Sequence, residues 1–183
     1  NMSLVELLLQ GKTTTPADLV KDLPGNNEAK AETIDNNLQH EIVKKMSSNS
    51  VYYGKLSEML KKIIMQRKIE AMSYEEYLRQ VVELAEAILH PETSGSYPDE
   101  VKDSAARRAL YDYFEQNVEL TIDVDGAIRV SIRPEWKRNF QKQQRIRLAI
   151  YQKLLLHSYS EDKATEETNN VFDIAQRQEE YDA

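Results

Sequence analysis

The sequence predicts a mainly α-helical fold, a multi-helix bundle, and leaves a short β-hairpin open at residues 118–132. Three observations favour this class. Apolar residues recur at intervals of three and four, which places them on one side of a helix. Serine capping patterns and proline positions mark several helix ends. The mean hydropathy of −0.65 favours an elongated set of helices over a thick core.

The first segment, residues 1–27, predicts two short helices. Ser3, with a glutamate three residues later, has the pattern of a capping box, and we expect Gly11 to end that helix. Thr15-Pro16 begins the second helix because proline suits a first helical turn, and Pro24–Asn27 ends it. Helices this short are not stable alone, so we expect them to pack on the rest of the chain.

Residues 28–90 form the predicted helical bundle region, with three amphipathic helices. Ser47–Ser50 separates the first two, Ser73 caps the third, and Pro91 ends it. Each helix has one apolar stripe at helical spacing. The stripes are Ile34, Leu38, Ile42 and Met46; Leu56, Met59, Leu60, Ile63 and Ile64; and Tyr77, Val81, Leu84, Ile88 and Leu89.

Residues 91–159 form a predicted C-terminal helical region, followed by an acidic tail at 160–183. Within the helical region we expect a helix at about 102–117 and a longer one at about 137–157. The tail is polar, and its apolar residues at 171–175 predict one last docked turn.

The segment 118–132 is open to two interpretations. Its apolar residues alternate strictly, and a loop of Val124, Asp125 and Gly126 would bring all of them to one face of a hairpin. Gly126 would then adopt the left-handed conformation that this loop needs. The local pattern therefore favours the hairpin, although a lone hairpin is marginally stable and needs helices to cover it.

Charge is distributed unevenly along the chain. The net charge of −7 argues against a domain that coats itself in nucleic acid. However, residues 129–153, which we call the basic segment, hold eight basic residues and one acid, whereas the acidic tail has the reverse balance. The two could pair within the chain or form separate contact surfaces. We weigh three interpretations of the basic segment: a solvated helix face, a docking surface for an acidic partner, and a phosphate contact.

Two groups of residues are candidates for binding. The candidates for contact with a partner or phosphate are Arg129, Arg133, Trp136, Lys137, Arg138, Asn139, Arg145 and Arg147. Tyrosine combines a large apolar ring with a polar hydroxyl, so tyrosines suit either interfaces or packing between helices of one domain. The interface candidates among the ten tyrosines are Tyr52, Tyr53, Tyr74, Tyr77, Tyr97 and Tyr111.

No motif in the sequence predicts a catalytic residue, a metal ligand or a cofactor. The chain has no phosphate-binding glycine loop, no GxSxG and no HExxH, and it has no cysteine. The three histidines, at positions 40, 90 and 157, lie in separate segments. Asp123 and Asp125 lack the following Glu-x-Lys of a nuclease metal site. We expect no membrane span, because no run of eighteen apolar residues exists, and we expect a cytoplasmic location.

Several blocks of sequence together resemble the R (motor) subunits of type I restriction-modification enzymes. The likeness covers about residues 28–157, and it rests on the order and spacing of the blocks. The blocks are AETIDNN at 31–37, YYGKLSEML at 52–60, QRKIEAMSYEEYL at 66–78, VELA at 82–85, SYP at 96–98, RALYD at 108–112, RPEWKRN at 133–139 and IRLAI at 146–150.

This resemblance implies that the chain is the non-catalytic C-terminal helical region of such a subunit. We expect a fragment of a longer protein, also because an asparagine precedes Met2. The parent would be an ATP- and Mg-dependent site-specific deoxyribonuclease. The implied role of this region is to attach the motor to the methyltransferase core, so the implied partners are the methyltransferase and specificity subunits, with DNA in the full complex.

Two positions depart from the usual pattern of these subunits. Members usually have a helix at 118–132, so the resemblance and the local alternation predict different structures there. Arg138 occupies a position where members usually have glycine, so the resemblance does not imply a glycine turn at Arg138. The competing hypothesis to docking is a module that binds nucleotide or DNA backbone through the basic segment.

Overall fold

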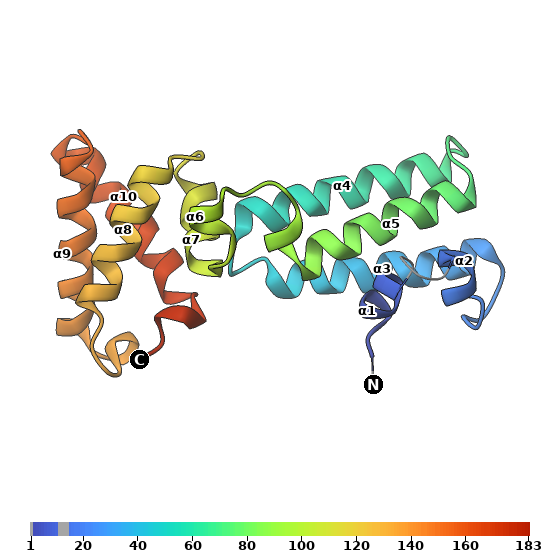
Figure 1. Ribbon diagram of the computed structural model, residues 1–183, viewed down its shortest axis with the longest axis horizontal. Coiled ribbons are helices and arrows are strands. Elements are labelled where there is room, and N and C mark those ends of the chain that lie inside the picture. The colour runs from blue at the N-terminus through green and yellow to red at the C-terminus, as the bar shows by residue number, and fades with distance from the viewer. Residues whose placement is uncertain (1, 11–14) are drawn as a thin grey trace. The chain divides into compact units, whose positions relative to one another are not determined.

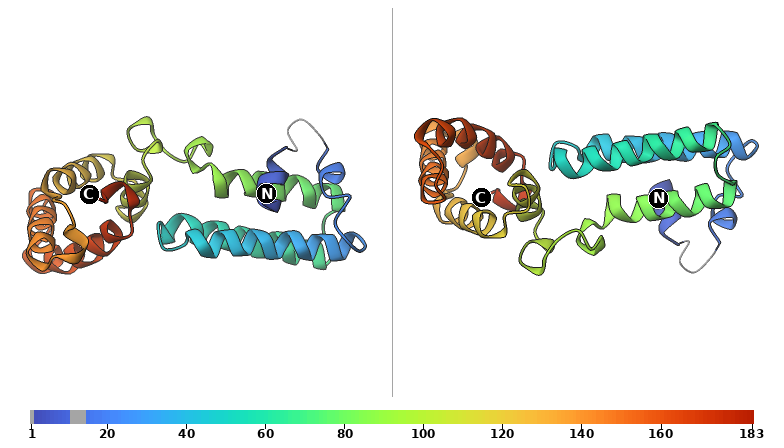
Figure 2. Two further views of the ribbon diagram at one scale, coloured as in Figure 1. Left: turned by 90° about the horizontal axis from the view of Figure 1, so that it is seen from below. Right: turned by 90° about the horizontal axis from the view of Figure 1, so that it is seen from above.

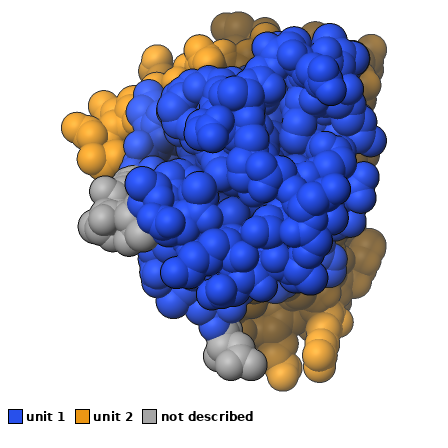
Figure 3. All heavy atoms as spheres, turned by 90° about the vertical axis from the view of Figure 1, so that its right-hand side faces the viewer, with its two compact units in different colours: residues 1–47, 52–96 blue, residues 48–51, 97–183 orange. Residues whose placement is uncertain are grey.

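A computed structural model describes residues 2–10 and 15–183, and those residues form α-helices and short 3-10 helices without a strand (Figure 1). The chain divides into two compact units, coloured in Figure 3. Unit 1 comprises residues 1–47 and 52–96, and unit 2 comprises residues 48–51 and 97–183. The mainly helical class is therefore confirmed.

Unit 1 is built on three long helices, α3, α4 and α5, which run lengthwise beside one another (Figure 1, Figure 2). The short helices α1 and α2 both pack on α5, and α1 also contacts α3. The bounds are α1 Leu4–Leu9, α2 Pro16–Leu19, α3 Asn27–Lys45, α4 Ser50–Lys68, α5 Tyr74–Leu89 and the 3-10 helix η2 Pro91–Thr93.

Local signals set several of these helix ends. The capping box at Ser3 is present in both directions, and Thr15 and Pro16 begin α2 as predicted. Ser73 caps α5 as predicted. Its spacing from Glu76 also predicts a capping box, but Glu76 instead accepts hydrogen bonds from Arg79 and Gln80 on α5. The predicted helix end at Gly11 lies outside the described residues; α1 itself ends at Leu9.

The predicted stripes form the core of unit 1. Their fully buried members include Ile34, Leu38, Ile42, Leu60, Tyr77, Leu84 and Ile88. Met59, which the spacing placed on the second stripe, is exposed instead. Burying these side chains removes apolar surface from water, which is the main favourable contribution to folding.

A buried ion pair lies inside this core. Asp35 of α3 accepts hydrogen bonds from Arg67 Nη2 of α4 and from the Tyr77 hydroxyl of α5, each at 2.5 Å. Arg67 also pairs with Glu28, and its guanidinium lies over the Tyr77 ring. Burial would lower the pKa of Arg67, but its bonds to Glu28 and Asp35 outweigh that effect and raise it. One polar cluster thus connects the three long helices.

Unit 2 is a second helical bundle, in which α8 packs on α9, α9 on α10, and α7 on α8 and α10 (Figure 1). The bounds are α6 Asp99–Lys102, α7 Ala105–Tyr113, α8 Val118–Ser131, α9 Phe140–Leu156 and α10 Glu161–Gln176, with 3-10 helices η3 Trp136–Arg138 and η4 Glu179–Tyr181. In its core, the rings of Trp136 and Phe172 pack edge to face, with 5.9 Å between their centroids.

Segment 118–132 is helical, so the interpretation as a hairpin was wrong. Asn117 caps α8 by accepting a bond from the Leu120 amide at 3.0 Å. Gly126 has no left-handed conformation, unlike Gly25 and Gly95. The buried side of α8 consists of Leu120, Thr121, Val124, Asp125, Ile128 and Ser131. Half of these residues are polar, which hid the helical period behind the alternation of β-branched residues.

The end of the chain is more ordered than one docked turn. Helix α10 extends over sixteen residues, capped by Ser160, and its apolar side buries Ala164, Val171, Phe172 and Ala175. Because α10 packs on both α7 and α9, the acidic tail completes the core of unit 2. None of the described helices is both long and apolar enough to cross a bilayer.

Candidate functional site

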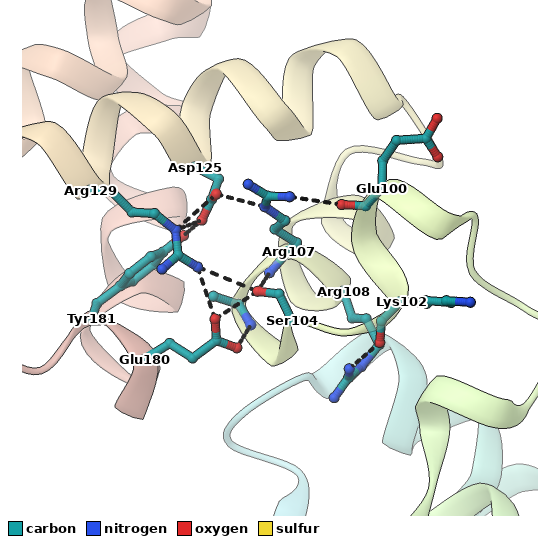
Figure 4. A network of polar contacts seen from close by, with 10 residues as sticks. Glu100, Lys102, Ser104, Arg107, Arg108, Asp125, Arg129, Glu180 and Tyr181 are labelled. Carbon is teal, nitrogen blue, oxygen red and sulfur yellow. Dashed lines mark hydrogen bonds and ion pairs between the residues drawn. The ribbon is translucent and has the colours of Figure 1, made fainter.

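The first residue of the basic segment, Arg129, pairs with a buried carboxylate in unit 2, that of Asp125 on α8 (Figure 4). Asp125 is fully buried and accepts hydrogen bonds from Arg107 Nε at 2.8 Å, Arg129 Nε at 2.9 Å and the Tyr181 hydroxyl at 2.6 Å. These donors come from α7, α8 and η4. A buried carboxylate is stable only when it is paired in this way.

Glu180 joins the same network from the end of the chain (Figure 4). It accepts hydrogen bonds from the Ser104 hydroxyl at 2.7 Å, from the Ala106 amide at 3.0 Å and from Arg129 Nη2 at 2.9 Å. Ser104 is the N-cap of α7, so this carboxylate lies where the helix dipole favours negative charge. Glu180 therefore contributes to the start of α7.

Two further contacts hold the same terminal residues. The indole of Trp136 donates to the Tyr181 carbonyl at 2.7 Å, and Lys137 pairs with Asp182. We call Glu180, Tyr181 and Asp182 the C-terminal clasp. The clasp joins η3 to α7 and α8, segments that are far apart in sequence.

The pKa values of the clasp follow from burial and pairing. Burial alone would raise the pKa of Asp125, but hydrogen bonds from Tyr181, Arg129 and Arg107 hold it below its ordinary value. Burial likewise opposes a lowered pKa at Glu180, and the bonds from Ser104, Ala106 and Arg129 outweigh it. Burial, followed by the charge of Asp125, raises the pKa of Tyr181. The network therefore holds two ionised acids and a neutral phenol near pH 7.

The other binding candidates of the basic segment are spread over several environments. Arg147 bonds to Asn169 and lies over the Phe172 ring, with 3.9 Å between the guanidinium carbon and the ring centroid. Asn139 is the N-cap of α9. Arg133 is exposed and donates to the carbonyls of Val130 and Ile132.

Arg138 and Arg145 are the exposed candidates without an internal partner. Their side chains make no ion pair or hydrogen bond within the part of the chain that the structure describes. The structure thus separates the candidates. Arg129 and Lys137 serve the clasp, Trp136 is buried, and Arg138 and Arg145 face solvent.

A groove of about 520 Å³ lies between α8 and α9. Small residues form part of its lining, and larger apolar side chains border it. The lining includes Gly126, Ala127 and Val130 of α8, and Ala149, Lys153 and Leu156 of α9. From sequence, Gly126 was considered for a hairpin loop and Asp123 for a metal site, but this groove was not predicted, because a hairpin at 118–132 would not create it.

The six tyrosine candidates lie within the units. In unit 1, the Tyr52 hydroxyl donates to the Ala87 carbonyl at 2.7 Å and the Tyr53 hydroxyl to the Ile88 carbonyl at 3.4 Å. Tyr74 stacks on the fully buried Tyr77, with 6.3 Å between centroids.

In unit 2, Tyr97 and Tyr111 are both buried, and their rings pack edge to face with 5.8 Å between centroids. The Tyr97 hydroxyl also donates to Asp112 at 2.5 Å. Five of the six rings are thus largely removed from solvent, and Tyr74 is half-buried.

The aspartates considered as a metal pair point to different partners. Asp123 pairs with His157 Nε2 at 2.7 Å, whereas Asp125 binds the two arginines. Among the described residues, no group of three or more acidic or histidine side chains is arranged to hold a metal ion.

Sequence reasoning missed the C-terminal clasp as a feature with named residues. The signal available was the opposite charge of the basic segment and the acidic tail, which suggested internal pairing without showing which residues pair. The structure pairs Arg129 with Glu180 and Lys137 with Asp182.

Comparisons of the chain with protein families, with curated proteins and with solved structures find no match.

Proposed function

We propose that this chain is the C-terminal helical region of a type I restriction enzyme R subunit, and that it docks the motor onto the methyltransferase core. The family assignment is supported by the blocks of sequence over residues 28–157. It is also supported at residues 118–131. The resemblance implies a helix there, whereas the local alternation favours a hairpin, and the segment is the helix α8. In this proposal the chain acts as a scaffold that presents contact surfaces to the methyltransferase and specificity subunits.

The observation that carries the docking role is a set of large apolar side chains exposed on α8 and α9. Val130 and Leu156 are each 75% exposed, Phe140 is 71% exposed and Leu148 is 56% exposed. Val130 and Leu156 both line the groove between α8 and α9. Large apolar side chains exposed on a surface are typical of protein–protein contacts. Their burial against a partner would contribute to the free energy of association.

Binding of nucleotide or DNA backbone is the alternative, and it has less support. Of the six cations that this hypothesis uses, Arg129 and Lys137 are paired with the clasp, and Arg147 contacts Asn169 and Phe172. Three exposed arginines remain, which is a small electrostatic footprint on a chain with a net charge of −7.

Binding to the purified methyltransferase core tests the docking proposal. We expect the chain to bind immobilised M and S subunits of its own system at micromolar concentration. An R subunit that lacks the segment corresponding to residues 100–183 should fail to assemble with that core. Absence of binding at micromolar concentration contradicts the proposal.

Titration with ATP and with duplex DNA at two salt concentrations tests the alternative. Phosphate binding would weaken steeply as ionic strength rises, because bound cations are released when the protein neutralises phosphates. We expect no measurable binding of either ligand. Salt-dependent binding that disappears in Arg138→Ala/Arg145→Ala would instead favour the alternative.

A further inference from the structure

The groove between α8 and α9 contains space that no side chain of the described residues fills. Asp123, near the start of α8, pairs with His157 just after α9, so the two helices run antiparallel. Figure 1 shows them side by side in unit 2. Val130 and Leu156 border the groove, and both are largely exposed. The groove is therefore apolar at its edges and unfilled by the chain's own side chains.

Gly126 keeps the middle of this groove open. Glycine inside a helix destabilises that helix relative to alanine. A Cβ atom added at Gly126 would meet nothing within 4 Å, so packing within the described chain does not require glycine there. The missing side chain instead allows the backbone of another element to approach α8 closely.

The α9 side of this groove contributes cations and no acid. From 136 to 160 the chain has six basic residues and no acidic residue. Arg145 lies one helical turn before Ala149, on the same side of α9, and its side chain is exposed. Lys153 lines the groove directly.

The opposite side carries the acidic residues of α8. Asp123 also lines the groove, but it is already paired with His157. Glu119 lies one turn before Asp123 and is exposed. The cations beside the groove that have no acidic partner in the described residues are thus Arg145 and Lys153, both on α9.

We infer that this groove binds an acidic amphipathic helix of a protein partner, with its apolar stripe between Val130 and Leu156 and its carboxylates beside Arg145. A helix in a groove uses apolar anchors for affinity, and complementary charge sets its direction. This inference rests on the proposed docking function and specifies the surface and the chemistry of the partner.

Two variants of the full chain test the groove against the methyltransferase core. Gly126→Leu fills the floor, and we expect it to weaken binding by about tenfold or more, since it builds a clash against the docked helix. Gly54→Leu is the matched control, because Gly54 is also a helix-interior glycine whose added Cβ would meet nothing within 4 Å. The control should bind as the unchanged chain does.

Charge reversal tests the chemistry of the partner. Arg145→Glu should weaken binding by about tenfold at low salt, because it places like charges together. The control is Arg177→Glu, which reverses an exposed cation after α10. Circular dichroism of each variant should show unchanged helix content. Equal affinity of all four variants overturns the inference and leaves the docking function standing.

A designed peptide separates the inference from the proposed function. The probe is an 18-residue helix with leucines at helical spacing and glutamates elsewhere, and the matched control has lysines for the glutamates. We expect the acidic peptide alone to shift the NMR signals of Gly126, Val130 and Ala149. Failure of the core to bind while the acidic peptide binds this groove contradicts only the proposed function.

Three outcomes overturn the inference, two from the peptide experiment and one from sedimentation of the chain alone. The first is equal binding of both peptides. The second is duplex DNA that displaces the acidic peptide and shifts the same signals. The third is self-association of the chain, measured by sedimentation, that Gly126→Leu abolishes, since a second copy would then occupy the groove.

Discussion

At the residue scale, unit 2 depends on a single buried carboxylate. Asp125 is held by two arginines and one phenol that come from three elements. Removing one partner of such a group leaves buried polar atoms unsatisfied, which costs more free energy than the bond itself contributes. Each contact of Asp125 therefore matters beyond its own strength.

Tyr181→Phe should destabilise the protein by about 1–3 kcal/mol, because Asp125 loses a buried hydrogen bond. Urea unfolding followed by circular dichroism measures the change. Tyr74→Phe is the control: its hydroxyl is buried and has no hydrogen-bond partner in the described residues, so its removal should be neutral or stabilising. Equal losses in the two variants would show that the Asp125 contact is not special.

Arg67→Ala should destabilise the protein by about 3–5 kcal/mol, because Asp35 would remain buried without its counter-charge. Arg79→Ala removes two exposed ion pairs, to Glu76 and Glu83, and should change stability far less, because water screens exposed charges. Denaturant midpoints of the two variants compare a buried with an exposed arginine. A midpoint for Arg67→Ala close to that of Arg79→Ala contradicts the prediction.

At the element scale, α8 combines a strand-like sequence with a helical structure. Val118, Ile122 and Val130 belong to the alternating set, yet none of them is fully buried. The helix instead buries Asp125 and Thr121 beside its apolar residues, because α7, α9 and the clasp surround that side. Tertiary contacts thus override a local preference for strand.

Gly126→Ala should stabilise the protein by about 0.5–1 kcal/mol, because Gly126 is inside a helix with open space at its Cβ position. Gly25→Ala should destabilise it, since Gly25 has a φ of +91° and its added Cβ would lie 2.6 Å from the Cβ of Ala29. Thermal unfolding of both variants checks the opposite signs. If Gly126→Ala destabilises the protein, Gly126 has the left-handed conformation of a hairpin loop and the prediction is wrong.

At the scale of the whole molecule, the end of the chain holds unit 2 together. The clasp and α10 connect α7, α8, η3 and α9, so residues distant in sequence become neighbours. At these contacts, two residues of the basic segment pair with two residues of the acidic tail: Arg129 with Glu180 and Lys137 with Asp182. Part of the sequence's strongest electrostatic signal therefore stabilises the fold, and α9 retains the exposed remainder.

Stability should fall with acid, in a way that depends on Asp125. Asp125 and Glu180 have pKa values in the folded state below their ordinary values of 3.8 and 4.5, so the unfolded state binds protons at a higher pH. Their contribution is fully present above about pH 5 and is lost as pH falls through the folded-state values. Urea unfolding between pH 7 and pH 3 measures this, and Asp125→Asn should show a weaker dependence. An unchanged pH dependence in that variant contradicts the assignment.

The sequence by itself determined the helical class, the caps at Ser3 and Ser73, and the stripes that form the core of unit 1. These features depend on contacts within a few residues, so they can be deduced from spacing alone. Only the tertiary structure decided the helix at 118–131, the partners of Asp125 and the groove beside Gly126. Each of these depends on which distant side chains surround a residue, and local periodicity carries no information about that.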